Sequence, residues 1–287
     1  MSLSADQIAR HPQLIPALRQ QARTLVGLYE SNPRLATVFA TQQRWLMAHI
    51  ALALFYRSDS DPQHRSLTIS RFVEQVQAHG VASRNTADAF SKEMLQYQFI
   101  RYLPSGSDGR VRPVEMMRTS LESVSGWVAL HLATLDAVDG GQRMASFVAH
   151  TDMLDRIEPL IADGLLARQS IREPSGTFSL FAWLDKGGIV MERIISGIAD
   201  AEEGVEQIST EVVSVTDMAE WLNLSRTHLV RKLREAEALG SIGWSGKRRQ
   251  SAMWVSRGFL NEIASAQAVK LAVIDAAFEQ IFSLQLR

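Results

Sequence analysis

A helix that begins after Ser225 is predicted to have an apolar side and a polar side. The apolar stripe recurs at three-to-four-residue spacing and consists of Leu229, Leu233 and Ala236. The same period turns Thr227, Arg231 and Arg234 to the opposite side. A helix fits the major groove of duplex DNA, and arginine can pair bidentately with guanine there. The polar side therefore has the chemistry to read base edges.

A shorter helix is predicted directly before this one. We expect Thr216 to cap its start, with Met218 and Leu222 facing inward. Residues 223–225 are expected to form a turn, and Ser225 to cap the second helix. This order of elements is typical of a helix-turn-helix motif.

A β-ribbon with a basic turn is predicted after the second helix. Its strands are residues 242–244 and 251–256, and its turn is 245–249. The turn contains three consecutive cations, Lys247, Arg248 and Arg249. Such a ribbon tip is suited to contact with phosphate or with the minor groove.

The first half of the chain contains the same order of patterns. Three pairs of segments recur at nearly one offset: 45–46 with 183–184, 83–100 with 225–242, and 132–137 with 271–276. A second ribbon is predicted at 99–103 and 110–116, after the earlier of these helix pairs. We infer an internal duplication, with the first unit at residues 1–140 and the second at 143–287. The Gly-containing turn at 139–142 separates them.

Segments 68–116 and 214–256 resemble the winged helix of the multiple-antibiotic-resistance regulator (MarR) family. In the later segment, residues 227–233 match the family's recognition helix, and 240–242 match the glycine and apolar strand that follow. In the earlier segment the ribbon is the better match, through Ile100, Arg101, Asp108, Arg110 and Val114. Its helix departs from the family pattern at Asp88, Ala89 and Gln98.

The resemblance implies a mainly α fold with two winged helix-turn-helix units and small β-ribbon wings, joined as a pseudo-dimer. It also implies a transcriptional regulator that binds duplex DNA. Expected base or groove contacts are Ser225, Thr227, Arg231 and Arg234 in the second unit and Asn85, Lys92 and Gln96 in the first. Expected phosphate or wing contacts are Arg84, Arg110, Arg112, Arg226, Lys247, Arg248 and Arg249. The second unit is expected to dominate, because Asp88 and Glu93 bring negative charge to the first.

Composition narrows the other classes of function. The 287 residues contain no cysteine and have a net charge of -1, with basic stretches on both sides of an acidic segment at 119–213. Disulfides, cysteine-ligated zinc and thiol nucleophiles are therefore excluded. No familiar catalytic frame occurs, so we expect no enzyme, cofactor or metal site. His150, Asp152 and Asp155 are interpreted as part of a solvated acidic face.

The longest apolar stretch, residues 45–56, is too short to span a membrane, and we expect a cytoplasmic protein without membrane contact. Two alternatives stay open. The helix units could bind another protein, or a cleft between the repeats could sense a small molecule. The identity of such an effector, and whether two chains pair as a homodimer, are not fixed by the sequence.

Overall fold

A computed structural model describes residues 2–33, 41–60, 67–104, 112–200, 204–247 and 251–282. Its helices in the first half are α1 (Ala5–Ala9), α2 (Leu14–Ser31), α4 (Gln42–Ser60), α5 (Ile69–Ala78), α6 (Arg84–Gln96) and α7 (Arg118–Asp139). Those in the second half are α8 (Arg143–Ala149), η1 (Thr151–Met153), α9 (Leu154–Ala167), α10 (Gln169–Arg172), α11 (Gly176–Ala182), α12 (Gly187–Ser196), α13 (Val215–Trp221), α14 (Arg226–Ala238) and α15 (Arg257–Phe282). The strands are β1 (Ile100–Tyr102), β2 (Val114–Met116), β3 (Gln207–Ser209), β4 (Ile242–Trp244) and β5 (Met253–Ser256). The prediction of a mainly helical protein is confirmed.

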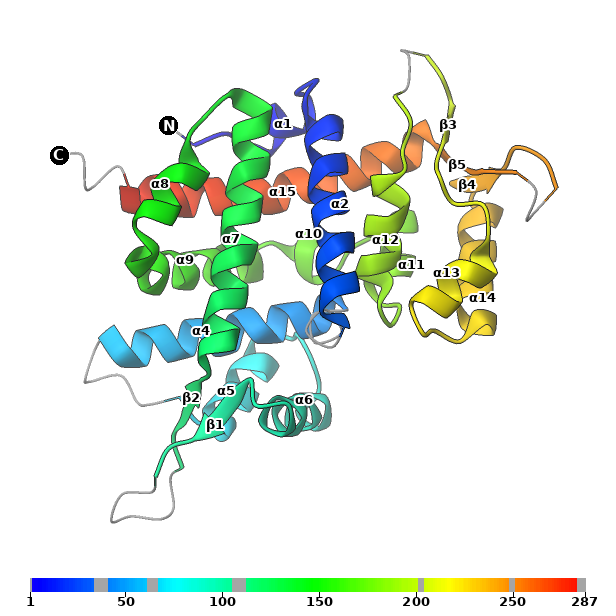
Figure 1. Ribbon diagram of the computed structural model, residues 1–287. Helices are drawn as coiled ribbons and strands as arrows, with labels where there is room; N and C mark the ends of the chain where they lie inside the picture. The colour runs from blue at the N-terminus through cyan, green and yellow to red at the C-terminus, as the bar shows by residue number, and fades with distance from the viewer. Residues whose placement is uncertain are drawn as a thin grey trace.

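The long helices form a central body that both halves share. α4 packs on α9, and α2 packs on α12, so each of these contacts joins the first half to the second. α1 packs on α15 and α8 packs on α7, which again joins opposite halves. Figure 1 shows α7 and α2 crossing α15 in this body, with α5, α6 and the β1–β2 ribbon at one end and α13, α14 and the β4–β5 ribbon at another. One continuous set of buried apolar side chains runs through the whole arrangement.

The two halves meet in sequence at a helix break. α7 ends at Asp139, Gly140 adopts a left-handed conformation with φ of 78°, and α8 begins at Arg143. The break therefore lies at the predicted turn. A residue without a side chain is favoured at Gly140, because L-residues pay a steric cost at positive φ.

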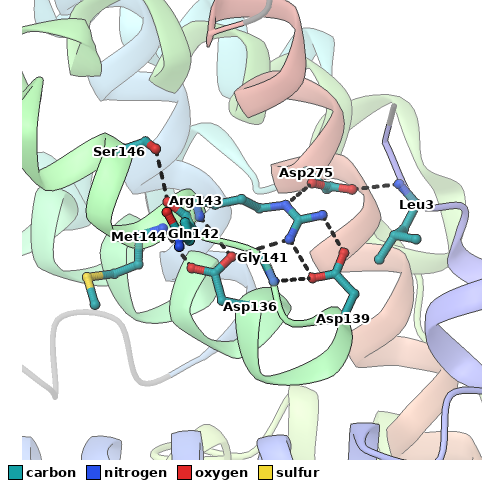
Figure 2. Close-up of polar contacts among 9 residues, drawn as sticks. All are labelled: Leu3, Asp136, Asp139, Gly141, Gln142, Arg143, Met144, Ser146 and Asp275. Atoms are coloured by element: carbon teal, nitrogen blue, oxygen red, sulfur yellow. Dashed lines mark hydrogen bonds and ion pairs between the residues drawn. The ribbon is translucent and has the colours of Figure 1, made fainter.

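A polar cluster around Arg143 holds this break against α15 (Figure 2). Arg143 Nη2 lies 2.7 Å from Asp139 Oδ2, and Arg143 Nε lies 2.7 Å from Asp275 Oδ1. The other oxygen of Asp275 accepts a 2.6 Å hydrogen bond from the backbone N–H of Leu3, whereas Asp136 accepts one of 2.8 Å from the backbone N–H of Arg143. Asp136 thus holds the start of α8, and Asp275 holds the segment that precedes α1.

The helix pairs begin with side-chain caps, but not always at the expected residue. Thr68 caps α5 and Ser83 caps α6 through the backbone N–H groups of Arg71 and Thr86. In the second half Ser214 caps α13, and the prediction that Thr216 does so is wrong, because the helix already starts at Val215. Ser225 occupies the cap position of α14 but makes no side-chain cap hydrogen bond.

The second ribbon is part of a three-stranded sheet, ordered β3-β5-β4. β3 was not predicted, because a three-residue strand with only Ile208 buried leaves no alternating pattern to detect. The β1–β2 ribbon has two strands and pairs Arg101 with Glu115. Strands β1, β2 and β5 lie within the predicted segments 99–103, 110–116 and 251–256, and each is shorter than its segment.

Candidate nucleic-acid interface

α14 presents the polar side that its sequence predicts. Leu229, Leu233 and Ala236 are buried, whereas Thr227, Arg231 and Arg234 are exposed. Ser225 and Arg226, at the start of the helix, are also exposed. Backbone N–H groups at a helix start attract anions, so this end of α14 combines two kinds of phosphate-binding group with an arginine face.

α6 has the same division of sides with a weaker charge. Ala87, Phe90 and Met94 are buried, and Arg84, Asn85, Ala89, Lys92 and Gln96 are exposed. When Ser83 is matched with Ser225, Ala89 stands at the place of Arg231, and Lys92 at the place of Arg234. The first helix therefore offers one cation on the stripe where the second offers two.

The two acidic side chains of α6, Asp88 and Glu93, point in different directions. Asp88 lies 4.0 Å from Arg84 on the exposed side of α6. Glu93 is instead turned toward α4, where Arg44 Nη2 lies 2.7 Å from its Oε1. The expectation that Glu93 stands beside the exposed basic groups is therefore wrong, because Arg44 draws it into a partly buried ion pair. On α14, Glu235 is half-buried, and its Oε1 lies 3.9 Å from Arg231 Nε. A hydrogen bond from Lys232 lowers the pKa of Glu235.

The four helices of the two pairs end in the same way. A left-handed residue follows each one: Gly80 after α5, Gln98 after α6, Asn223 after α13 and Gly240 after α14. In each case the next backbone N–H bonds to a carbonyl in the last turn, as Phe99 does to Met94 and Ser241 does to Ala236. The four ends therefore share one left-handed terminal geometry.

Each helix pair is also tied to the opposite half of the chain. The His79 carbonyl, at the end of α5, accepts a 3.2 Å hydrogen bond from Arg172 Nη1 of the second half. The Leu222 carbonyl, at the end of α13, accepts one of 3.3 Å from Tyr29 Oη of the first half, and one of 2.6 Å from Lys186 Nζ. Sequence reasoning missed these contacts, because no local pattern joins residues so far apart in the chain.

Two of the predicted ribbon cations, Lys247 and Arg112, lie among the described residues. Lys247 is exposed, and Arg112 is exposed with its guanidinium 4.3 Å from the centre of the Tyr102 ring. Arg110, Arg248 and Arg249 lie outside the described residues. Arg101 is ion-paired with Glu115 across the ribbon, so part of the charge of the first ribbon is neutralised.

An apolar cavity of about 50 Å³ lies behind α6, between α4, α5 and the first ribbon. Ser91 lines it, at the place where α14 has the buried Leu233.

In the described ranges, no group of three or more metal-ligating side chains is arranged to hold a metal ion. The same ranges contain no helix with the length and apolarity that crossing a membrane requires.

No family model, curated protein or solved structure matches the chain.

Proposed function

We propose that the protein is a transcriptional regulator that binds duplex DNA through two winged helix-turn-helix units. The observation that carries the proposal is the exposed stripe of Thr227, Arg231 and Arg234 on α14. That stripe follows a tight turn from α13 and precedes a ribbon whose turn includes the exposed Lys247. A rigid helix with this stripe can enter a major groove while the ribbon reaches the adjacent backbone.

We further propose that the two units arose by duplication and form a pseudo-dimer within one chain. Support comes from the order α5-α6-β1-β2-α7, which parallels α13-α14-β4-β5-α15. The contacts between halves also come in exchanged pairs, α4 with α9 beside α12 with α2, and α1 with α15 beside α8 with α7. An arrangement of this kind presents two DNA-reading helices from a shared core, as dimeric readers do.

A salt titration of binding to duplex DNA tests the proposal. The logarithm of the binding constant should fall steeply with the logarithm of salt, since each phosphate contact releases counterions. Replacing Lys247, Arg248 and Arg249 together by alanine should flatten that slope by up to about three units and weaken binding to all sequences. Arg10→Ala, in an exposed position at the end of α1, is the matched control and should leave the slope unchanged. A wild-type affinity for duplex DNA that does not change with salt concentration would contradict the proposal.

Arg231→Ala separates base reading from phosphate binding. It should cost about 1–3 kcal/mol on the preferred site and relax sequence preference, while leaving affinity for random duplexes nearly unchanged. An equal loss on all sequences would place Arg231 at a phosphate instead.

A protein-binding role is the second candidate, and it applies chiefly to the first unit. There Ala89 replaces the arginine of the exposed stripe, and the nearby Tyr97 and Tyr102 side chains are exposed. Exposed tyrosines favour protein interfaces, because each offers a large rigid contact with a polar end. If α6 serves this role, substitutions on it will leave DNA affinity unchanged.

A further inference from the structure

The apolar cavity behind α6 belongs to the first unit, since all of its lining residues lie between positions 48 and 120. Small side chains line it from two helices: Ala48 and Ala51 from α4, and Ser91 from α6. Where α6 has Ser91, α14 has the larger and buried Leu233. The first unit therefore has a cavity of about 50 Å³ at a place that a larger side chain occupies in the second.

Both hydroxyl groups of the lining are bonded to backbone carbonyls. Ser91 Oγ donates a 3.0 Å hydrogen bond to the Ala87 carbonyl, and Ser120 Oγ donates one of 2.6 Å to the Phe99 carbonyl. The other lining side chains are apolar. A buried water needs about two to four polar partners, whereas apolar cavities stay dry and admit apolar molecules. The lining therefore favours a hydrocarbon over water.

The lining of the cavity reaches the molecular surface. Four of its residues are half-buried: Ala51 of α4, Ile69 at the start of α5, Met116 at the end of β2 and Ser120 near the start of α7. A closed cavity would have buried walls on every side. These four residues form the mouth of the cavity, through which a ligand can enter without unfolding of the first unit.

The volume of the cavity limits what it can hold. A pocket that encloses a drug-sized ligand has at least roughly 300 Å³, and an apolar cavity of about 150 Å³ holds a benzene ring. At the same volume per carbon, the cavity behind α6 takes roughly two carbons. Each buried CH₂ group strengthens binding by about fourfold, so a free molecule of this size would bind weakly. The dimensions therefore favour the end of a longer chain whose remainder lies at or beyond the mouth.

We propose that this cavity binds the end of an alkyl chain, which enters through the mouth. Phe90, Ser91 and Met94 form its wall on α6, and Ala48 and Leu52 belong to its wall on α4. A bound chain end contacts both helices, so it stabilises the position of α6 against α4. Its effect on DNA affinity rests on the proposed function, whereas binding of the chain end does not.

The first experiment titrates the full chain with n-octanol and follows the methyl signals of labelled methionine by nuclear magnetic resonance. The chain has ten methionines, of which Met94 and Met116 line the cavity. Their two signals should shift to saturation in the wild type. Ser91→Val puts two methyl groups into the space and should weaken octanol binding by about tenfold or more. Ser91→Ala removes the same hydroxyl without filling the space, so its octanol affinity should be no weaker than that of the wild type.

Ala51→Val narrows the cavity from α4 and replaces Ser91→Val if that variant does not fold. Xenon under pressure is the second probe, because it tests entry of a single apolar atom. Shifts of the Met94 and Met116 signals with xenon but not with octanol would show that no chain end enters, and would overturn the proposal. It is likewise overturned if neither probe shifts these signals, or if the narrowed variants bind octanol as tightly as the wild type does.

The second experiment follows hydrogen-exchange protection of the α6 amides without DNA. With free octanol at about ten times its dissociation constant, protection should rise by about tenfold in the wild type and stay constant in Ser91→Val or Ala51→Val. Unchanged protection in an octanol-bound wild type would overturn the stabilisation of α6. Octanol binding at the cavity of a chain that binds no duplex DNA supports this inference and refutes the proposed function alone.

Discussion

Gln98 is one of three non-glycine residues with a positive φ among the described residues, together with Lys186 and Asn223. It has φ of 58° after α6, at the place where α14 is followed by Gly240 with φ of 69°. A side chain in this conformation meets a steric cost that glycine avoids. We expect Gln98→Gly to raise the free energy of unfolding by about 0.5–1 kcal/mol, measured by urea denaturation. Asn223→Gly, at φ of 50°, is the comparison and should gain less, since asparagine tolerates this region. If Gln98→Gly did not raise the free energy of unfolding, the greater conformational freedom of glycine in the unfolded chain would offset the relief of steric strain in the folded one.

The carboxylate of Asp139 makes the cluster around Arg143 sensitive to acid. A side-chain hydrogen bond from Arg143 lowers the pKa of Asp139 in the folded chain. A lowered folded pKa means that the stabilisation is present above the unfolded value of about 3.9 and is lost as pH falls through the folded value. We expect Asp139→Asn to reduce stability near neutral pH and to lessen its decline in acid, as followed by thermal unfolding. Asp152→Asn, at an exposed site, should change neither property; equal curves for Asp139→Asn and wild type would contradict the account.

At the scale of the element, α6 can be given the arginine that α14 has at the matching position. Ala89 and Arg231 occupy matching exposed places, and the Arg84–Asp88 pair already reduces the charge of α6. If both helices approach DNA, Ala89→Arg should strengthen binding by about 1–3 kcal/mol on a site with a guanine at the matching position. Affinity measured at fixed salt checks this, with Ala238→Arg as a charge control farther along α14. Equal gains from the two substitutions would show a general charge effect and not groove reading.

At the scale of the whole molecule, the shared core predicts a fixed distance between α6 and α14, the two helices that we propose contact DNA. One chain should then occupy two half-sites about one helical turn, or roughly 34 Å, apart. Inserting about half a turn of DNA between the half-sites should reduce affinity to that of a single half-site. Band-shift titration with a measured chain-to-duplex ratio checks both points. A complex with two chains per duplex, or one that tolerates the insertion, would show that the chain does not act as a pseudo-dimer by itself.

The sequence alone determined the features that depend on neighbouring residues. The apolar stripe of Leu229 and Leu233 predicted which side of α14 is exposed, and the turn at 139–142 predicted where α7 ends. These succeed because helical period and left-handed turns are properties of a few consecutive residues. Cap positions were less well determined, as Ser214 and Thr216 show, because several hydroxyl residues near a helix start compete for the same N–H groups.

Tertiary structure decided how these elements are held and which charges remain available. The direction of Glu93 depends on Arg44 of α4, and the packing of α4 on α9 places His49 against Glu158. The tie between Arg172 and the His79 carbonyl likewise joins residues from opposite halves. No periodic pattern records such pairs, because their energy arises only after burial brings distant segments together and removes water from their polar groups. The sequence therefore determined the exposed sides of α6 and α14 as local features, and the shared core decided their placement and charge.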